Sequence, residues 1–140
     1  MKITLHTHHS LKVLVHLAAN PDRLSSIGEI AQAHGISHNH LMKVVHGLRV
    51  SGFVDAVRGR CGGIRLARPA REITLGELVR HTEKALEPHA GTARGSDREK
   101  PATHIFERAF GSFFSTLNEF TVADIAEDEA SGAANRKSPQ

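Results

Sequence analysis

Residues 25–68 read SSIGEIAQAHGISHNHLMKVVHGLRVSGFVDAVRGRCGGIRLAR, and their pattern indicates the fold class. Its first half predicts two short helices joined by a tight turn. Its second half predicts a glycine-rich β-hairpin that carries arginines. A helical pair followed by such a hairpin is the order of elements in a winged helix-turn-helix. The sequence therefore predicts a mainly α fold with a small β-wing.

The helical half has clear start and stop signals. The first helix of this pair begins at Ser26, because the Ser26 hydroxyl and the Glu29 carboxylate have the spacing of a capping box. Gly35 ends it, since glycine suits the left-handed conformation just past a helix. Ser37 caps the second helix, whose buried face is predicted by apolar residues at helical spacing: Leu41, Val44, Val45 and Leu48.

The second helix leaves polar side chains on or near its other side. Donors in the first turns of such a helix are suited to base edges in the major groove and to phosphates. An ordinary helical hairpin with a solvated polar face gives the same pattern. We expect DNA contacts from the two caps and from this face, at Ser26, Ser37, His38, Asn39, His40 and Lys43, with His46 nearby.

The hairpin favours DNA more strongly. Strand-like residues 53–57 and 64–67 flank a turn, and positions 58 to 71 hold arginines at 58, 60, 65, 68 and 71 with no acidic residue. Guanidinium groups bind phosphates bidentately, and glycines allow the backbone to approach a ligand closely. The alternative is a solvated basic hairpin. We expect Arg58, Arg60 and Arg65 to contact the DNA backbone.

Composition sets the outer bounds. The chain has 140 residues and a net charge of +3. Residues 1–87 hold 12 lysines and arginines against 7 acids, a net +5, and residues 88–140 hold 6 against 8, a net −2. No apolar run is long enough to cross a membrane, and no phosphate loop, nucleophile elbow or metal-protease motif is present. We expect a cytoplasmic protein that is not an enzyme.

The chain divides into four predicted parts. Residues 1–87 form the winged helix-turn-helix domain, including a first helix from about Thr7 or His8 to Ala19. Residues 88–102 are poor in apolar side chains and are predicted to be a mobile loop. Residues 103–126 hold a dimerisation helix and a short following helix, and residues 127–140 are predicted to be a disordered tail.

The dimerisation helix is predicted from its aromatic spacing. Its apolar residues recur at intervals of 4, 3, 4 and 3, which is a heptad seam: Phe106, Phe110, Phe113, Leu117 and Phe120. Packing of this helix on its own domain is the alternative. We favour a seam shared by two subunits, because a small DNA reader gains affinity and spacing specificity by forming a homodimer.

These motifs together resemble a known family. Residues 1–18, the helix at 26–31, the run from Ser37 to Arg80 and the later NEFTVADI are similar to the winged-helix repressor family of iron–sulfur regulators, closest to the branch of the nitric-oxide-sensing repressor NsrR. The resemblance implies a homodimeric repressor of stress, nitric-oxide or iron-related genes. It also implies a double-stranded, pseudo-palindromic DNA operator, with residues 37–48 in the major groove and the wing alongside.

The chain departs from this family at the sensor. The sensing members of this family hold an iron–sulfur cluster with three cysteines in the loop before the long helix. In this chain the corresponding positions fall near Pro88, Arg94 and Lys100, and none of them is a cysteine. An acidic residue that helps hold the cluster in some members corresponds to His8. Thiolates are the usual ligands of such clusters, so we expect no ordinary three-cysteine cluster and predict no cofactor.

Three alternatives remain for the missing sensor. Cys61, the single cysteine, lies among wing arginines that favour a reactive thiolate, and its oxidation would weaken DNA binding. Imidazoles bind several transition metals, and the candidate ligands are His8, His89 and His104. The third alternative is a constitutive DNA-binding module without a sensor.

Overall fold

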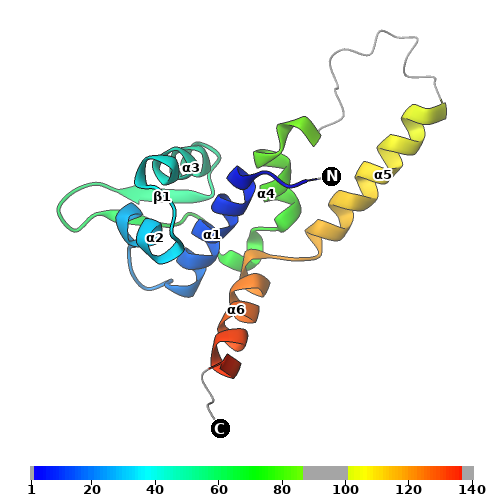
Figure 1. The fold of residues 1–140 in the computed structure, drawn as a ribbon. Helices are drawn as coiled ribbons and strands as arrows, with labels where there is room; N and C mark the ends of the chain where they lie inside the picture. Colours follow the sequence, from blue (N-terminus) through cyan, green and yellow to red (C-terminus); the bar gives the residue numbers. More distant parts are fainter. Residues whose placement is uncertain (1, 87–100, 137–140) are drawn as a thin grey trace.

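The structure is a computed structural model that describes residues 2–86 and 101–136. Within these residues the chain is mainly helical and has one two-stranded antiparallel sheet, which confirms the predicted fold class (Figure 1). The elements are, in chain order, α1 Leu5–Ala19, α2 Ile27–His34, α3 His38–Val50, β1 Val54–Val57, β2 Gly63–Leu66, the 3₁₀ turn η1 Ala70–Glu72, α4 Leu75–Thr82, the 3₁₀ turn η2 Lys84–Leu86, α5 Pro101–Asn118 and α6 Val122–Arg136.

Hydroxyl caps fix where the helices begin, as the sequence predicts. The Oγ of Ser26 accepts a hydrogen bond from the backbone N–H of Glu29 at 3.0 Å, and Ser37 caps α3 in the same way through His40. Gly35 ends α2 with φ 63°, a left-handed conformation that favours glycine. One detail differs from a capping box, in which the carboxylate would accept a hydrogen bond from the backbone N–H of Ser26. The Glu29 carboxylate instead forms an ion pair with the guanidinium of Arg23, which lies before the helix.

Helix α1 begins earlier than predicted, at Leu5, because Thr4 caps it. The cap is held from the far end of α4: Glu83 Oε1 accepts hydrogen bonds from the N–H and the Oγ1 of Thr4, each at 2.7 Å, and one from Thr7 Oγ1. Burial alone would raise the pKa of Glu83, but these donors outweigh it and the pKa is lowered. The carboxylate therefore ties α4 to the start of α1.

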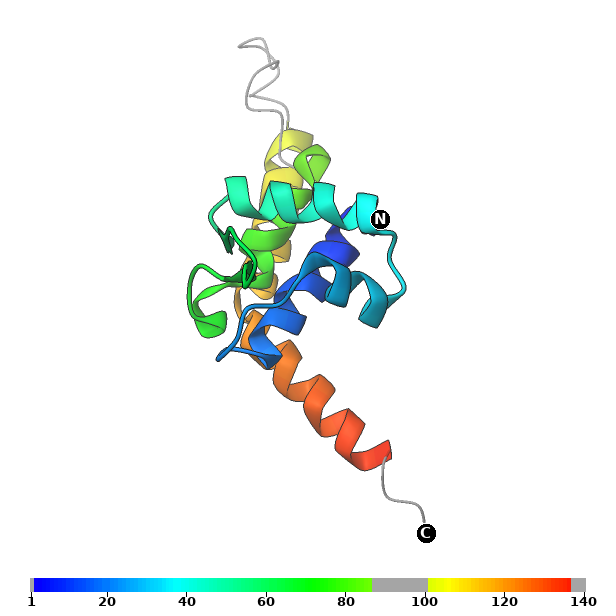
Figure 2. The same cartoon turned by 90° about the vertical axis from the view of Figure 1, so that its left-hand side faces the viewer.

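The core forms around α1, which packs against α2, α3, α4 and α6. Figure 2 looks onto the side of the molecule that carries α2, α3 and the wing. The predicted apolar stripe of α3 is fully buried there, at Leu41, Val44, Val45 and Leu48. Phe53 is 2% exposed and continues this core into the hairpin. The two elements predicted to face DNA, α3 and the wing, are thus built on one core.

The C-terminal part corrects two expectations. Helix α5 ends at Asn118, so Phe120 of the predicted seam lies outside it. The predicted disordered tail begins at residue 127, but α6 continues to Arg136, and the remaining four residues lie outside the described part. The first turns of α6 are held on the core, with Val122 buried and Ile125 and Ala126 packed against it. The alanines that follow favour helix without an apolar pattern, so periodicity carries no signal for this extension.

The start of α5 also differs from expectation. The helix begins at Pro101, two residues before the predicted Thr103, and proline suits a first helical position because its missing N–H would have no intrahelical partner. The remainder of the predicted loop at 88–102 lies outside the described residues. No helix in the described part of the chain combines the length and apolarity needed to cross a bilayer.

Candidate nucleic-acid interface

Helix α3 turns one face into the core and presents the other to solvent. Opposite its buried stripe lie the exposed side chains of His38, Asn39, Lys43 and His46. They span the first two-thirds of the helix, the part that enters a groove in helix-turn-helix proteins. The structure thus brings most of the predicted base-contacting residues onto one surface.

The two capping serines lie at the N-termini of α2 and α3. Each uses its Oγ as an acceptor for a backbone N–H, so its own O–H remains a donor. Both residues are exposed. Ser26 and Ser37 are therefore placed to donate to phosphate oxygens while they cap their helices.

His40 differs from its neighbours on α3. It is half-buried, and its ring stands edge-on to His9 of α1 with a centroid separation of 4.7 Å. Burial, and then the nearby His40, lower the pKa of His9. His40 thus joins α3 to α1 and offers less free surface than His38 or Asn39.

The hairpin needs glycine at its turn. Strand β1 pairs with β2 in register from Val54 opposite Leu66 to Val57 opposite Gly63. Gly59 has φ 117°, and a Cβ on Gly62 would lie 2.3 Å from the carbonyl oxygen of Val57. These two glycines allow the tight reversal that carries Arg58 and Arg60 at the tip of the wing.

A short β-bridge fixes the wing to the helix-turn-helix. The N–H of Ser25 donates to the carbonyl of Ile64 at 3.0 Å, and the N–H of Ile64 donates back at 2.8 Å. A Cβ on Gly63 would meet the carbonyl oxygen of Ser25 at 2.8 Å. Ser25, one residue before the cap of α2, thereby sets the position of the hairpin. The sequence does not reveal this buried residue, since nothing in its type signals a bridge.

The wing arginines divide into free and engaged groups. Arg58, Arg60 and Arg65 are exposed and form no ion pair within residues 2–86 and 101–136. Arg68 instead binds the Glu77 carboxylate at 2.7 Å and lies over the Phe53 ring. The three free guanidinium groups are the ones that the sequence assigns to the DNA backbone.

One carboxylate beside this surface already has a cationic partner. Glu29 on α2 receives two hydrogen bonds from Arg23, one of them at 3.0 Å, and this contact lowers the pKa of Glu29 to about 2. The acid is therefore ionised and paired at neutral pH. This pairing reduces the repulsion that a bare carboxylate at the start of α2 would exert on phosphates.

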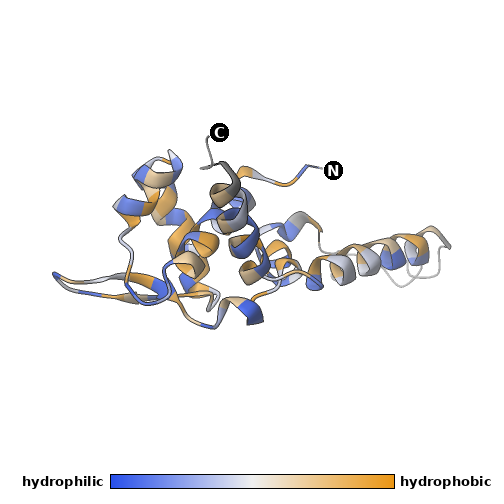
Figure 3. Cartoon of the chain, turned by 90° about the horizontal axis from the view of Figure 1, so that it is seen from below, coloured by the Kyte–Doolittle hydropathy of each residue, from blue (hydrophilic) through white to orange (hydrophobic). Residues whose placement is uncertain are grey.

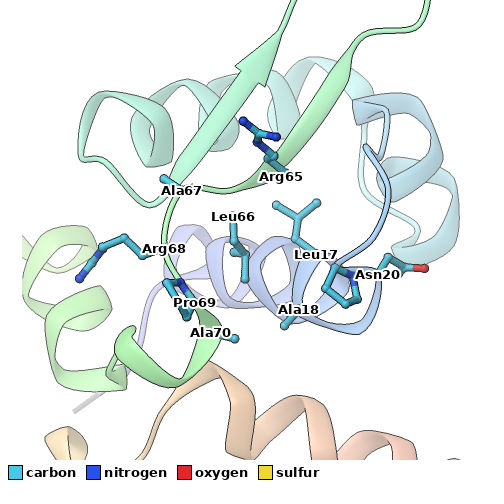
Figure 4. A pocket seen from close by; sticks show the side chains of 10 residues that line it. Leu17, Ala18, Asn20, Arg65, Leu66, Ala67, Arg68, Pro69 and Ala70 are labelled. Atoms are coloured by element: carbon cyan, nitrogen blue, oxygen red, sulfur yellow. The ribbon is translucent and has the colours of Figure 1, made fainter.

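A hollow of about 310 Å³ lies at the base of the wing (Figure 4). It is bounded by the end of α1 and by residues 65–70, with Leu17, Leu66 and Pro69 among its ten lining residues. None of those ten is an acid, histidine, cysteine or serine. The hollow thus has no general base or nucleophile for catalysis.

Helix α5 presents an apolar face on the opposite side of the molecule from the wing (Figure 3). Ile105 and Phe106 are each 65% exposed, and Phe110, Phe113 and Leu117 of the predicted seam are half-buried. Phe114, which lies outside that seam, is 4% exposed and stacks under the Arg80 guanidinium of α4 at 4.4 Å. One row of α5 thus binds its own domain, and the seam row leaves Phe106 exposed and its next three members half-buried.

The candidate sensor residues lie apart. Cys61 is exposed near the wing tip, His8 is exposed on α1, and His104 on α5 lies 3.8 Å from Glu107. His89 lies outside the described residues. In residues 2–86 and 101–136, no three histidine, cysteine, aspartate or glutamate side chains gather closely enough to hold a metal ion.

Comparisons with known proteins agree with this architecture. The model of the Rrf2 family, described as an iron-dependent transcriptional regulator, matches residues 3–128. The solved structure of CymR, the global cysteine regulator of B. subtilis, is 27% identical with a TM-score of 0.74, covering 91% of this chain and 97% of that one. IscR of T. potens is 26% identical with a TM-score of 0.72, covering 100% and 93%. An oxidized form of S. aureus CymR is 28% identical with a TM-score of 0.70, covering 91% and 97%.

Proposed function

The chain belongs to the Rrf2 family of transcriptional regulators, and we propose that it acts as a homodimeric repressor on a pseudo-palindromic operator. It is a DNA-binding regulator of the winged-helix type and not an enzyme. Helix α3 enters the major groove through its first turns, and the wing lies along the neighbouring phosphate backbone.

One observation carries this proposal. The exposed polar face of α3 and the wing, whose three exposed arginines form no ion pair among the described residues, stand on one core, and the Ser25–Ile64 bridge fixes the wing to the segment just before α2. Base readout requires a rigid element in the groove, and phosphate contacts set its register. A surface that fixes both kinds of contact relative to one another suits a sequence-specific reader.

The open face of α5 supports the homodimer. Phe106 is exposed although it is large and apolar, and the half-buried side chains of the seam extend the same row. Two copies that bury this row against each other would carry two wings facing away from the shared helices. Such a dimer fits two half-sites about 34 Å apart, one helical turn of DNA.

The proposed regulator works without a three-cysteine iron–sulfur cluster. Thiolates are the usual cluster ligands, and the only cysteine of the chain is on the wing rather than before α5. The donor set therefore does not fit the group that the family description implies. We assign the targets to stress, nitric-oxide or iron-related genes, in keeping with the family resemblance.

A second candidate mode of regulation uses Cys61. Its thiol is exposed beside Arg60, and one S. aureus relative has been solved in an oxidized form. With hydrogen peroxide, the thiolate attacks one oxygen, the O–O bond breaks, and the products are a sulfenic acid and, after proton uptake, water. The larger polar group would then stand against the phosphates, and operator affinity would fall.

The DNA-binding proposal is tested by selecting sequences from a random duplex library with the full chain. We expect a pseudo-palindrome bound by two copies. Asn39→Ala should alter the preferred base at one position of each half-site, because a bidentate asparagine–adenine contact provides about 1–3 kcal/mol of discrimination. Recovery of no common sequence would contradict the proposal.

The sensing alternatives are separated on the selected operator. Binding is measured with and without peroxide, nitric oxide, iron and zinc, for the wild type and for Cys61→Ser. A weaker complex with peroxide in the wild type alone supports Cys61, and equal weakening in both proteins excludes it. A response to iron or zinc supports a histidine-bound metal, whereas no response to any agent identifies a module without a sensor.

A further inference from the structure

We propose that Met42 on α3 is a specificity-determining residue that contacts the 5-methyl group of a thymine, an inference that rests on the proposed placement of α3 in the major groove. The residue lies outside the set that the sequence assigns to DNA. Its chemistry also differs from that set, because it supplies an apolar surface among hydrogen-bond donors.

Met42 does not contribute to the buried core. It is 49% exposed, whereas Leu41 beside it and Val44 two residues later are 0% exposed. A methionine at this position therefore leaves apolar surface in water in the free chain. Contact with an apolar group on the DNA would cover that surface.

The surroundings of Met42 are those of a base-reading surface. On a helix, residues three and four apart are neighbours, with Cβ atoms about 5–6 Å apart. Met42 therefore lies beside Asn39 on one side and His46 on the other, both exposed. No acid occurs in α3. An apolar side chain framed by hydrogen-bonding side chains, on a helix without acids, is positioned for DNA rather than for a protein partner.

The position along the helix selects thymine as the ligand. Thymine presents a methyl group in the major groove, and adenine presents the N6 and N7 pair that asparagine binds. Successive bases stack about 3.4 Å apart. With Asn39 on an adenine, a side chain about 5–6 Å further along lies over the next or second base pair. The unbranched thioether of methionine adapts readily to such a contact.

Two observations separate Met42 from other exposed apolar residues. The dimer face on α5 lies on the other side of the molecule (Figure 1), so Met42 is not part of that face. Val50, also on α3, is 75% exposed but ends the helix, about 12 Å further along its axis. The N-terminal part of a recognition helix contacts the bases, which leaves Val50 as a matched control.

The test replaces thymines with deoxyuridine, which lacks only the methyl group. Each thymine of the selected operator is replaced singly, and the dissociation constant of the full chain is measured at one salt concentration. The wild type should bind about fourfold more weakly when one particular thymine of a half-site is replaced, as expected when one methyl group is no longer buried. Met42→Ala should bind both operators equally.

Val50→Ala should keep the wild-type pattern, and thermal unfolding of Met42→Ala should match the wild type because the side chain is outside the core. The inference is overturned if Met42→Ala retains the same deoxyuridine effect, or if no replaced thymine weakens the wild type. Such results would leave sequence-selected binding intact and remove only the role of Met42. Failure to select any sequence would instead overturn the proposed function, and this inference with it.

Discussion

At the scale of single residues, the wing depends on glycines that permit close backbone contact. Gly63 is one such case, because the carbonyl of Ser25 and the Cβ of Leu24 lie where its side chain would be, at 2.8 and 3.0 Å. Both belong to the segment that anchors the wing. The glycine pair is visible in the sequence, but only the structure shows that the second glycine serves the bridge rather than the turn.

Gly63→Ala should therefore loosen the wing. We expect a decrease of about 1–3 kcal/mol in the free energy of unfolding, typical of overpacking, with weaker operator binding. Gly47→Ala is the control, because a Cβ there meets nothing within 4 Å and alanine favours the α3 helix. Denaturant unfolding of both variants measures the difference. Equal stability of the two would show that the Ser25 contact does not constrain residue 63.

Histidines make the contact between α1 and α2 sensitive to acid. The rings of His16 and His34 stand edge-on with centroids 5.4 Å apart. Burial, then the neighbouring His16 and Lys12, lower the pKa of His34, although Glu129 of α6 opposes this. The Nε2 atom of His34 is buried and has no hydrogen-bond partner among the described residues, whereas Nε2 of His16 lies 3.6 Å from Oε1 of Glu29.

Stability should fall as the pH drops below about 6.5, the ordinary histidine pKa. The unfolded chain binds protons there that the folded chain, with its lowered His34 pKa, does not, so protons favour unfolding. The contribution of His34 to the free energy of unfolding is fully present above that pH, and it is lost as the pH falls through the lowered pKa of His34. His34→Gln should flatten the dependence between about pH 5 and 7, measured by denaturant unfolding. An unchanged slope in the variant would contradict this account.

At the scale of elements, α5 has two rows with different tasks. The heptad spacing predicts the row that includes Phe106, but spacing alone cannot tell which row meets the chain's own domain. That task falls to Phe114, under Arg80. Gly76 of α4 permits the close approach, since a Cβ there would lie 3.1 Å from the carbonyl oxygen of Phe114.

Substitutions in the two rows should separate assembly from stability. Phe106→Glu should shift the chain from dimer to monomer in sedimentation experiments while the subunit stays folded, because a charge would stand in the shared seam. Phe114→Ala should cost about 3–5 kcal/mol of stability, the usual cost of emptying a buried phenylalanine site. A folded Phe106→Glu variant that remains dimeric would place the subunit interface elsewhere.

At the scale of the whole molecule, the sequence predicted the architecture better than the relations between its parts. The serine caps, Gly35 and the apolar stripe of α3 predicted the helix-turn-helix because these signals are local. The tie from Glu83 to Thr4, the bridge at Ser25 and the extension of α6 depend on distant pairing or on helix propensity, and neither produces an apolar periodicity. The sequence shows Arg68 among the basic residues of the wing, but it does not predict the ion pair of Arg68 with Glu77, because that pair also forms between separate elements.

In our proposal, α3 and the wing form one DNA-binding surface, in which α3 contacts the bases and the wing contacts the phosphates. These roles are distinguished by the salt dependence of operator affinity, measured for the wild type, for Arg58→Ala/Arg60→Ala, and for Arg108→Ala on the distant α5 as control. The wing variant should bind more weakly, and its log–log slope should be shallower by about one unit for each phosphate that it no longer neutralises, with unchanged base preference. An identical slope in the wing variant and the wild type would show that Arg58 and Arg60 do not neutralise phosphates.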